Sequence, residues 1–170
     1  MNPVLFIMCG RSFAGKTTLR KELIKRFKLN VASVDERIDI HKLNVEEMTQ
    51  EDWNMVYSET YDHLKKLLSH GKSTILDMGN LEKHERDTAR AIAKDYKIPT
   101  ILIYVNTTLE EVKNRWIQNQ KIDGGRKMDE KVFNKAQEKF QEPTPDENPI
   151  VYNSKMDLGK WIEENLNQRL

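Results

Sequence analysis

Short apolar runs alternate with amphipathic stretches along the whole chain. The apolar runs predict strands, because a strand that is buried on both faces reads as a continuous apolar segment. They cover residues 4–9, 30–34, 73–76, 100–105 and 150–152. The amphipathic stretches carry apolar residues every three or four positions and therefore predict helices. They cover about residues 17–28, 51–69, 82–95, 109–119, 129–140 and 156–167, whereas the polar residues 36–50 predict loop with some helix.

The order of these elements predicts an α/β fold. Strands that alternate with helices pair in parallel through right-handed crossovers, which gives a three-layer sandwich with helices on both faces of the sheet. We expect a five-stranded parallel sheet. A chain of 170 residues can bury a sizeable core without disulfides or metals, so we expect one domain over residues 1–170.

A glycine-rich motif, GRSFAGKT, lies between the first predicted strand and the first predicted helix. It matches the pattern GxxxxGK[ST] in the strand–loop–helix context that the pattern requires. In such a P-loop, backbone N–H groups point at phosphate oxygens, Lys16 reaches the outer phosphates and the Thr17 hydroxyl joins Mg²⁺. An ordinary glycine turn is the alternative, but packing alone requires neither a lysine nor a hydroxyl there. We therefore expect ATP or GTP to be bound with Mg²⁺ by Gly10, Arg11, Ser12, Phe13, Ala14, Gly15, Lys16, Thr17 and Thr18.

Carboxylates follow two of the predicted strands. Asp35 ends the strand at residues 30–34, and Asp77 ends the strand at residues 73–76. Ligands bind at the carboxyl edge of open α/β sheets, so Asp77 should lie near Lys16 and Mg²⁺. Met78 follows Asp77 where a hydrolytic ATPase commonly carries a glutamate, which favours phosphate transfer over hydrolysis. The alternative is that both aspartates only stabilise local turns.

These motifs together resemble a known family. The glycine loop, Asp35 in SVDERID, and Asp77 with Asn80 in ILDMGNL are similar to the small P-loop kinases, in particular to the group of polynucleotide 5′-hydroxyl kinases, chloramphenicol phosphotransferase and zeta-toxin-like kinases. The resemblance covers nearly the whole chain. It implies a nucleoside-kinase-like P-loop NTPase fold with strand order 2-3-1-4-5 and a small lid.

The resemblance also implies roles for particular residues. Asp35 matches the aspartate that accepts the proton of the substrate hydroxyl, and Arg37, Asp77 and Asn80 are implied to bind the substrate. A carboxylate suits this role, because the attacking alcohol needs a positioned proton acceptor more than a strong one. Thr17 and Asp77 are the implied metal ligands.

The implied lid covers about residues 115–130. Arg115 is expected to contact the nucleotide and Arg126 to act as a catalytic arginine. A closed lid excludes water and strengthens the stabilisation of charge. Family members carry a further arginine near Asn119 or Gln120, which this chain lacks.

Four further features have two interpretations each. The segment EPTPDENP resembles a family turn that flanks the adenine, or it is a plain connecting loop. Arg86 matches a family arginine, or it is a surface arginine. The aromatic stripe of Trp53, Tyr57 and Tyr61 either belongs to the core or lines an acceptor pocket. Cys9, the single cysteine, reads as a small buried hydrophobe rather than a reactive thiol.

The charge balance indicates which class of molecule accepts the phosphoryl group. There are 28 basic and 27 acidic residues, so no highly basic surface is evident. The sequence therefore favours an ATP-dependent kinase that phosphorylates a hydroxyl of a small molecule. A nucleic-acid 5′-hydroxyl is the second acceptor, and a non-catalytic ATP-binding regulatory module is the rival from another class.

The expected cellular location follows from the apolar segment before the glycine loop. An apolar run of six residues leads directly into the loop, so cleavage of a signal peptide there would destroy the site. No segment approaches the about 20 apolar residues of a membrane helix. We therefore expect a cytoplasmic protein.

Overall fold

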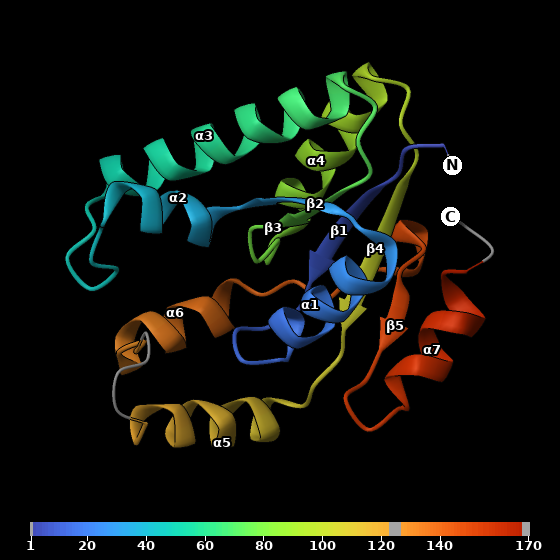
Figure 1. Ribbon diagram of the computed structural model, residues 1–170. Helices are drawn as coiled ribbons and strands as arrows, with labels where there is room; N and C mark the ends of the chain where they lie inside the picture. Colours follow the sequence, from blue (N-terminus) through green and yellow to red (C-terminus); the bar gives the residue numbers. More distant parts are fainter. Residues whose placement is uncertain (1, 123–126, 168–170) are drawn as a thin grey trace.

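The computed structural model describes residues 2–122 and 127–167 (Figure 1). Its sheet contains β1 (Leu5–Cys9), β2 (Asn30–Ser33), β3 (Thr74–Asp77), β4 (Thr100–Val105) and β5 (Ile150–Tyr152). The strands lie in the order β2-β3-β1-β4-β5, and every pairing is parallel. The predicted fold class and strand order are confirmed.

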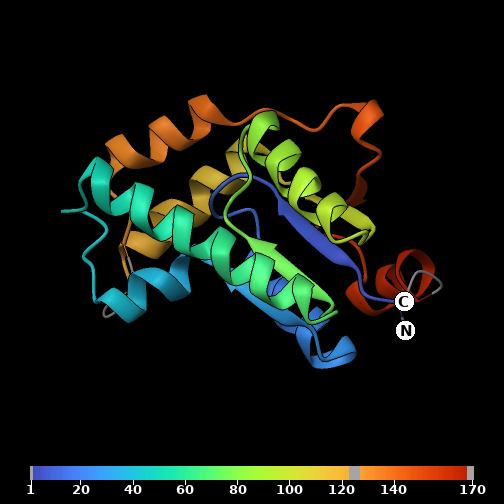
Figure 2. The same ribbon diagram turned by 90° about the horizontal axis from the view of Figure 1, so that it is seen from above.

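Helices cover both faces of this sheet. They are α1 (Lys16–Phe27), α2 (Val34–His41), α3 (Gln50–Ser69), α4 (Lys83–Asp95), α5 (Leu109–Gln120), α6 (Glu130–Lys139) and α7 (Leu158–Asn165), with a 3₁₀ turn at Pro145–Glu147. Figures 1 and 2 show α3 and α4 together on one side of the sheet, and in both views α2, α5 and α6 lie toward the same end of the molecule. No helix in the described ranges is both long and apolar enough to span a membrane.

Two hydrophobic cores result from the alternation of side chains along the strands. In β1, Phe6 and Met8 face the core that is closed by α1, α5, α6 and α7. Leu5, Ile7 and Cys9 face the core beneath α3 and α4. All five residues are fully buried, as expected for the central strand of a parallel sheet.

The largest difference from the predicted elements lies after β2. The strand ends at Ser33, and α2 begins directly at Val34. Asp35 therefore lies in the first turn of a helix, and the prediction that it ends a strand is wrong. Asp35 and Glu36 stabilise this helix start, because negative charge is favourable near a helix N-terminus.

Candidate active site

The glycine loop has the strand–loop–helix geometry of a P-loop. Gly10 has φ of +153°, and a Cβ there would lie 2.7 Å from the carbonyl oxygen of Val105. Gly15 has φ of +107° and caps the start of α1. Both positions therefore require glycine, because other residues would clash or be strained.

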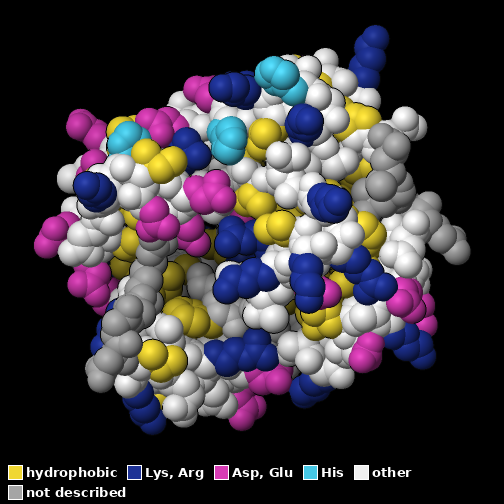
Figure 3. Space-filling model, viewed as in Figure 1, with side chains coloured by type: hydrophobic (Ala, Val, Ile, Leu, Met, Phe, Trp, Pro, Cys, Tyr) yellow, Lys and Arg dark blue, Asp and Glu magenta, His cyan; other side chains and the backbone are white. Residues whose placement is uncertain are grey.

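Lys16 is folded back over the loop that precedes it. Its Nζ donates hydrogen bonds to the carbonyl oxygens of Gly10 at 2.7 Å and Arg11 at 2.9 Å. Burial lowers the pKa of Lys16, and the nearby carboxylates of Asp77 and Asp35 act in the opposite direction. Figure 3 shows Lys and Arg side chains gathered along one side of a hollow in the middle of one face. Such a concentration of positive charge suits phosphate groups.

Asp77 lies at the end of β3 and is held by an arginine that the sequence analysis missed. Arg20 Nη1 donates to Asp77 Oδ2 at 2.8 Å and to Ser33 Oγ at 3.4 Å. Both charged side chains are largely buried. Burial raises the pKa of Asp77, whereas Lys16 and Arg20 lower it. Arg20 lies four residues after Lys16, on the same face of α1, and this spacing was the available signal.

The proposed metal ligands, Thr17 and Asp77, offer oxygen atoms of the kind that Mg²⁺ prefers. Thr17 is exposed in the first turn of α1. Asp77 Oδ2 accepts the bond from Arg20, which leaves Oδ1 as a further acceptor. The donor set therefore fits Mg²⁺, and the assignment of both residues stays a prediction.

Asp35 and Arg37 are not brought together by the structure. Two residues apart on α2, they lie about 200° apart around the helix axis. Asp35 is exposed, and its charge acts on both Lys16 and Asp77. Arg37 instead lies 4.0 Å from Glu36. Burial lowers the pKa of His63 on α3, and the charge of Arg37 lowers it further. Lys16, Asp35 and Asp77 thus share one site, while the substrate role of Arg37 stays a prediction.

The aromatic stripe of α3 reaches the vicinity of Asp35. Burial raises the pKa of Tyr57 to about 12, and the charges of Glu85 and Asp35 add to this rise. Trp53 and Tyr57 form a ring pair with centroids 6.1 Å apart, and Tyr61 follows them on the same face. The three side chains are half-buried and pack against the core, which confirms the core interpretation, while their role in an acceptor pocket stays a prediction.

Asn80 is fully buried and ties the turn after β3 to β1. Its Nδ2 donates to the carbonyl oxygen of Met8 at 2.8 Å. The residue adopts the left-handed conformation with φ of +48°, which asparagine tolerates well. These contacts give Asn80 a structural role below the site, and its substrate role stays a prediction.

Arg115 holds the P-loop from the side of α5. Its Nη1 donates to the carbonyl oxygens of Phe13 at 3.2 Å and Ala14 at 2.9 Å, and its Nη2 donates to Ser154 Oγ at 2.8 Å. The buried Thr107 hydroxyl also donates to the carbonyl oxygen of Ala14 at 2.8 Å. Thr107 follows β4 at the ligand-binding edge of the sheet, and this position in the sequence could have indicated its role. Nothing in the sequence indicates the role of Ser154. The predicted catalytic residue Arg126 lies outside the described residues.

Helix α5, which overlaps the predicted lid, and helix α6, which follows it, pack on the P-loop through aromatic contacts. Phe133 of α6 stacks on Trp116 of α5, with centroids 4.7 Å apart, and lies 6.1 Å from the ring of Phe13. The Arg11 guanidinium lies 4.4 Å above the centre of the Phe140 ring. Arg11 and Phe13 therefore join the P-loop to α6 and to the residue that follows it. That residues 115–130 move as a lid stays a prediction.

Arg86 is fully buried, so its interpretation as a surface arginine is wrong. Its Nε and Nη2 donate to the two carboxylate oxygens of Glu147 at 2.8 and 2.7 Å, and its Nη1 reaches the carbonyl oxygens of Asn80 and Gln141. Arg90 adds a further bond to Glu147 at 2.7 Å. The segment EPTPDENP is therefore joined to α4 through Glu147. Ser154, which follows β5, accepts the bond from Arg115 instead.

Comparison with known proteins agrees with this geometry. A family model described as an AAA domain, AAA_33, matches residues 5–143. The chain belongs to this family of P-loop kinases. The resemblance to small P-loop kinases is thus confirmed. No curated protein matches the chain.

Solved structures with a similar fold cover most of the chain. An unliganded sugar kinase from Janibacter sp. HTCC2649 has a TM-score of 0.68 at 21% identity, covering 98% of this chain and 93% of that one. Kti12 of Chaetomium thermophilum, in complex with ADP-AlF3, has a TM-score of 0.77 at 16% identity, covering 94% of each chain. A chain of the Pnkp1/Rnl/Hen1 RNA repair complex has a TM-score of 0.64 at 17% identity, covering 82% of this chain and 47% of that one. These likenesses show the P-loop fold.

Proposed function

We propose that this protein is an ATP-dependent kinase that transfers the γ-phosphoryl group to a hydroxyl of a small molecule. The observation that carries the proposal is the meeting of Lys16, Asp35 and Asp77 at one edge of the sheet, where each acts electrostatically on another. In this arrangement, the lysine would bind the phosphates of the nucleotide that donates the phosphoryl group, and a carboxylate beside it would accept the proton of the acceptor hydroxyl. Membership of the AAA_33 family supports the same reaction class.

The donor half follows from the P-loop. Backbone N–H groups of residues 10–18 would hold the phosphates, and Lys16 would exchange its bonds to the carbonyls of Gly10 and Arg11 for phosphate oxygens. Mg²⁺, held by Thr17 and Asp77, would neutralise charge on the β- and γ-phosphates. Arg115, which donates to the carbonyl oxygens of Phe13 and Ala14, would hold the main chain of the loop in place for this binding.

The acceptor half rests on Asp35. In the proposed step, the acceptor oxygen attacks the γ-phosphorus in line with the bond to the β-phosphate oxygen, and the Asp35 carboxylate takes the hydroxyl proton. One P–O bond forms and one breaks, which releases ADP. Asp35 is exposed to solvent in the first turn of α2. Tyr57 and Trp53 offer apolar surface beside it for the carbon skeleton of the acceptor.

A polynucleotide 5′-hydroxyl is the second acceptor, favoured by the likeness to a chain of an RNA repair complex. The two acceptors differ in the salt dependence of binding, because a strand that contacts several lysines releases counterions and a neutral alcohol does not. Steep salt dependence of the acceptor KM would identify the strand.

A screen with radiolabelled ATP tests the proposal. The acceptors are sugars, nucleosides, other hydroxyl metabolites and 5′-hydroxyl oligonucleotides, and the expected result is labelled product that depends on Lys16. If the protein binds ATP but labels no acceptor in this panel, the kinase proposal is contradicted and the regulatory-module interpretation is supported. The Lys16→Ala variant is the control, because it removes phosphate binding in either case.

A further inference from the structure

The exposed face of α6 carries lysines at regular intervals. Lys131, Lys135 and Lys139 follow one another four residues apart, and all three are exposed. The helical rise places successive members about 6 Å apart along one face. We call these three residues the lysine stripe. Lys127 precedes the helix at the same interval.

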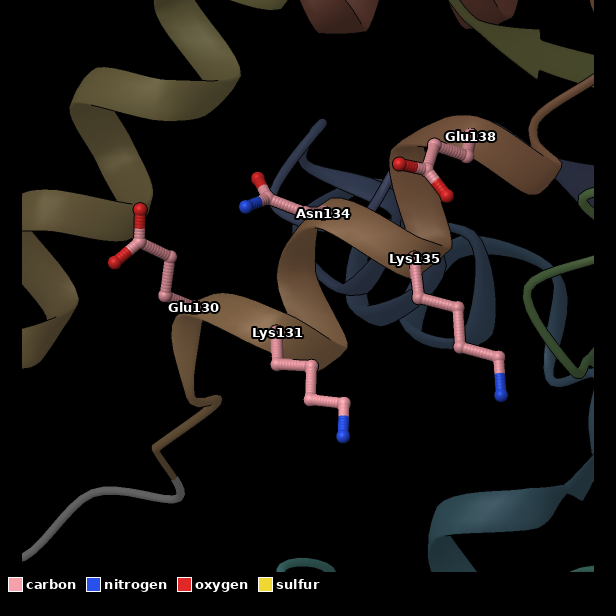
Figure 4. A pocket seen from close by; sticks show the side chains of 5 residues that line it. All are labelled: Glu130, Lys131, Asn134, Lys135 and Glu138. Carbon is pink, nitrogen blue, oxygen red and sulfur yellow. The ribbon is translucent and has the colours of Figure 1, made fainter.

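The stripe has no acidic partner within residues 2–122 and 127–167. None of its lysines forms an ion pair there, although Glu130 and Glu138 are on the same helix. Figure 4 shows Lys131 and Lys135 pointing to the same side, away from α5, whereas Glu130 points toward α5. Lysines at i and i+4 repel each other and destabilise a helix. A negatively charged partner would relieve this repulsion.

The surroundings of the stripe leave room for such a partner. An open surface depression of about 670 Å³ is lined by Lys131 and Lys135 of the stripe together with Glu130, Asn134 and Glu138, and Lys139 is not part of its lining. The opposite face of α6 is anchored, because Phe133 is buried against Trp116. Arg11 of the P-loop donates to Gln137, which lies on the same anchored side of the helix as Phe133. The stripe therefore has a fixed orientation, on the side of α6 that faces away from these contacts.

We propose that the lysine stripe binds the phosphate backbone of a single-stranded nucleic acid. A strand carries one phosphate per nucleotide, so a row of lysines that turns slowly around the helix can neutralise several phosphates at once. The net charge of +1 gives no indication of this local row of positive charge, because acidic residues elsewhere in the chain balance it. Binding needs no phosphate transfer, so the inference goes beyond the proposed function.

Two other anionic partners fit the stripe less well. A helix that binds a membrane surface places apolar residues beside its lysines. The apolar residues of α6 are instead packed inside, with Phe133 only 3% exposed. A single phosphate is smaller than the row, which extends about 12 Å along the helix from Lys131 to Lys139.

Fluorescence anisotropy without ATP tests the inference. The probe is a single-stranded RNA of about 20 nucleotides, labelled at its 3′ end and titrated from about 50 to about 200 mM salt. The variants are the triple Lys131→Gln/Lys135→Gln/Lys139→Gln and the control Lys94→Gln, an exposed lysine on α4. The triple variant should weaken binding and reduce the slope of log K against log salt by about 2, or about 0.7 per lysine. The control should keep the wild-type slope.

Three results would overturn the inference. The first is that RNA does not bind at the lowest salt, and the second is that the triple variant binds with the wild-type affinity and slope. The third is that polyglutamate of equal charge, or phosphatidylserine vesicles, bind to the stripe more tightly than RNA. Because ATP is absent throughout, these results are independent of whether kinase activity is found. A circular dichroism spectrum identical to that of the wild type shows that the triple variant is folded.

Discussion

Replacing Glu147 by glutamine would remove the negative charge from a buried network while keeping the shape of the side chain. The Glu147 carboxylate accepts bonds from Arg86 at 2.8 and 2.7 Å and from Arg90 at 2.7 Å. The side chains of Arg86 and Glu147 are 0% and 1% exposed. Removing one partner leaves a buried charge without compensation, which costs about 3–5 kcal/mol of the free energy of unfolding.

The pKa of Glu147 gives a second measure of the same effect. Burial raises this pKa, but hydrogen bonds from Arg86 and Arg90 outweigh burial and lower it from 4.5 to about 2. A difference of this size corresponds to about 3 kcal/mol at neutral pH. Because the folded-state pKa is below the unfolded one, the stabilisation is present above pH 4.5 and is lost as the pH falls toward about 2.

Urea denaturation followed by circular dichroism measures both effects. At pH 7 the Glu147→Gln variant should lose about 3–5 kcal/mol relative to the wild type, and this difference should shrink at about pH 3. The control is Glu46→Gln, an exposed residue, which should stay within about 0.5 kcal/mol. A loss below about 1 kcal/mol at pH 7, or a difference that does not change with pH, would refute the reasoning.

Three further predictions concern the P-loop and its neighbours. Arg115→Met removes the bonds to Phe13 and Ala14, so the ADP affinity measured by calorimetry should fall about tenfold; an unchanged Kd would contradict the role of Arg115. Phe133→Ala should cost about 3–5 kcal/mol in urea denaturation, because the ring is buried between Trp116 and Phe13; a cost below about 1 kcal/mol would contradict this packing. Burial raises the pKa of Cys9 to about 11, so its reaction with a disulfide reagent at about pH 8 should be about 100-fold slower in the folded protein than in urea, and equal rates would contradict this burial.

The sheet and the P-loop were predictable because their signals are local. The apolar runs at β1 and β4 are continuous, and Gly10 and Gly15 are required by backbone geometry that the motif itself encodes. The start of α2 was missed because Val34 is β-branched and apolar and so extends the strand pattern. No loop separates β2 from α2, and the pattern therefore contains no boundary.

The tertiary contacts of the site were predictable only in part. Arg86 lies on the buried face of α4 with Ala89 and Ala93, three and seven residues later, so the helical period indicated a buried arginine. Its partner Glu147 is 61 residues away along the chain, and nothing local connects the two. The pairing of Arg20 with Asp77, separated by 57 residues, is of the same kind. Such pairs depend on how the elements pack, which periodicity does not encode.

The role of Asp35 is the central claim, and single-turnover transfer by Asp35→Asn tests it most directly. With an acceptor found by the ATP screen, the variant should transfer phosphate about 10²- to 10⁴-fold more slowly, because asparagine cannot take the hydroxyl proton. Its ADP affinity should stay at the wild-type value, and the control Asp95→Asn, an exposed residue at the end of α4, should keep the wild-type rate. Transfer by Asp35→Asn at the wild-type rate would contradict the account.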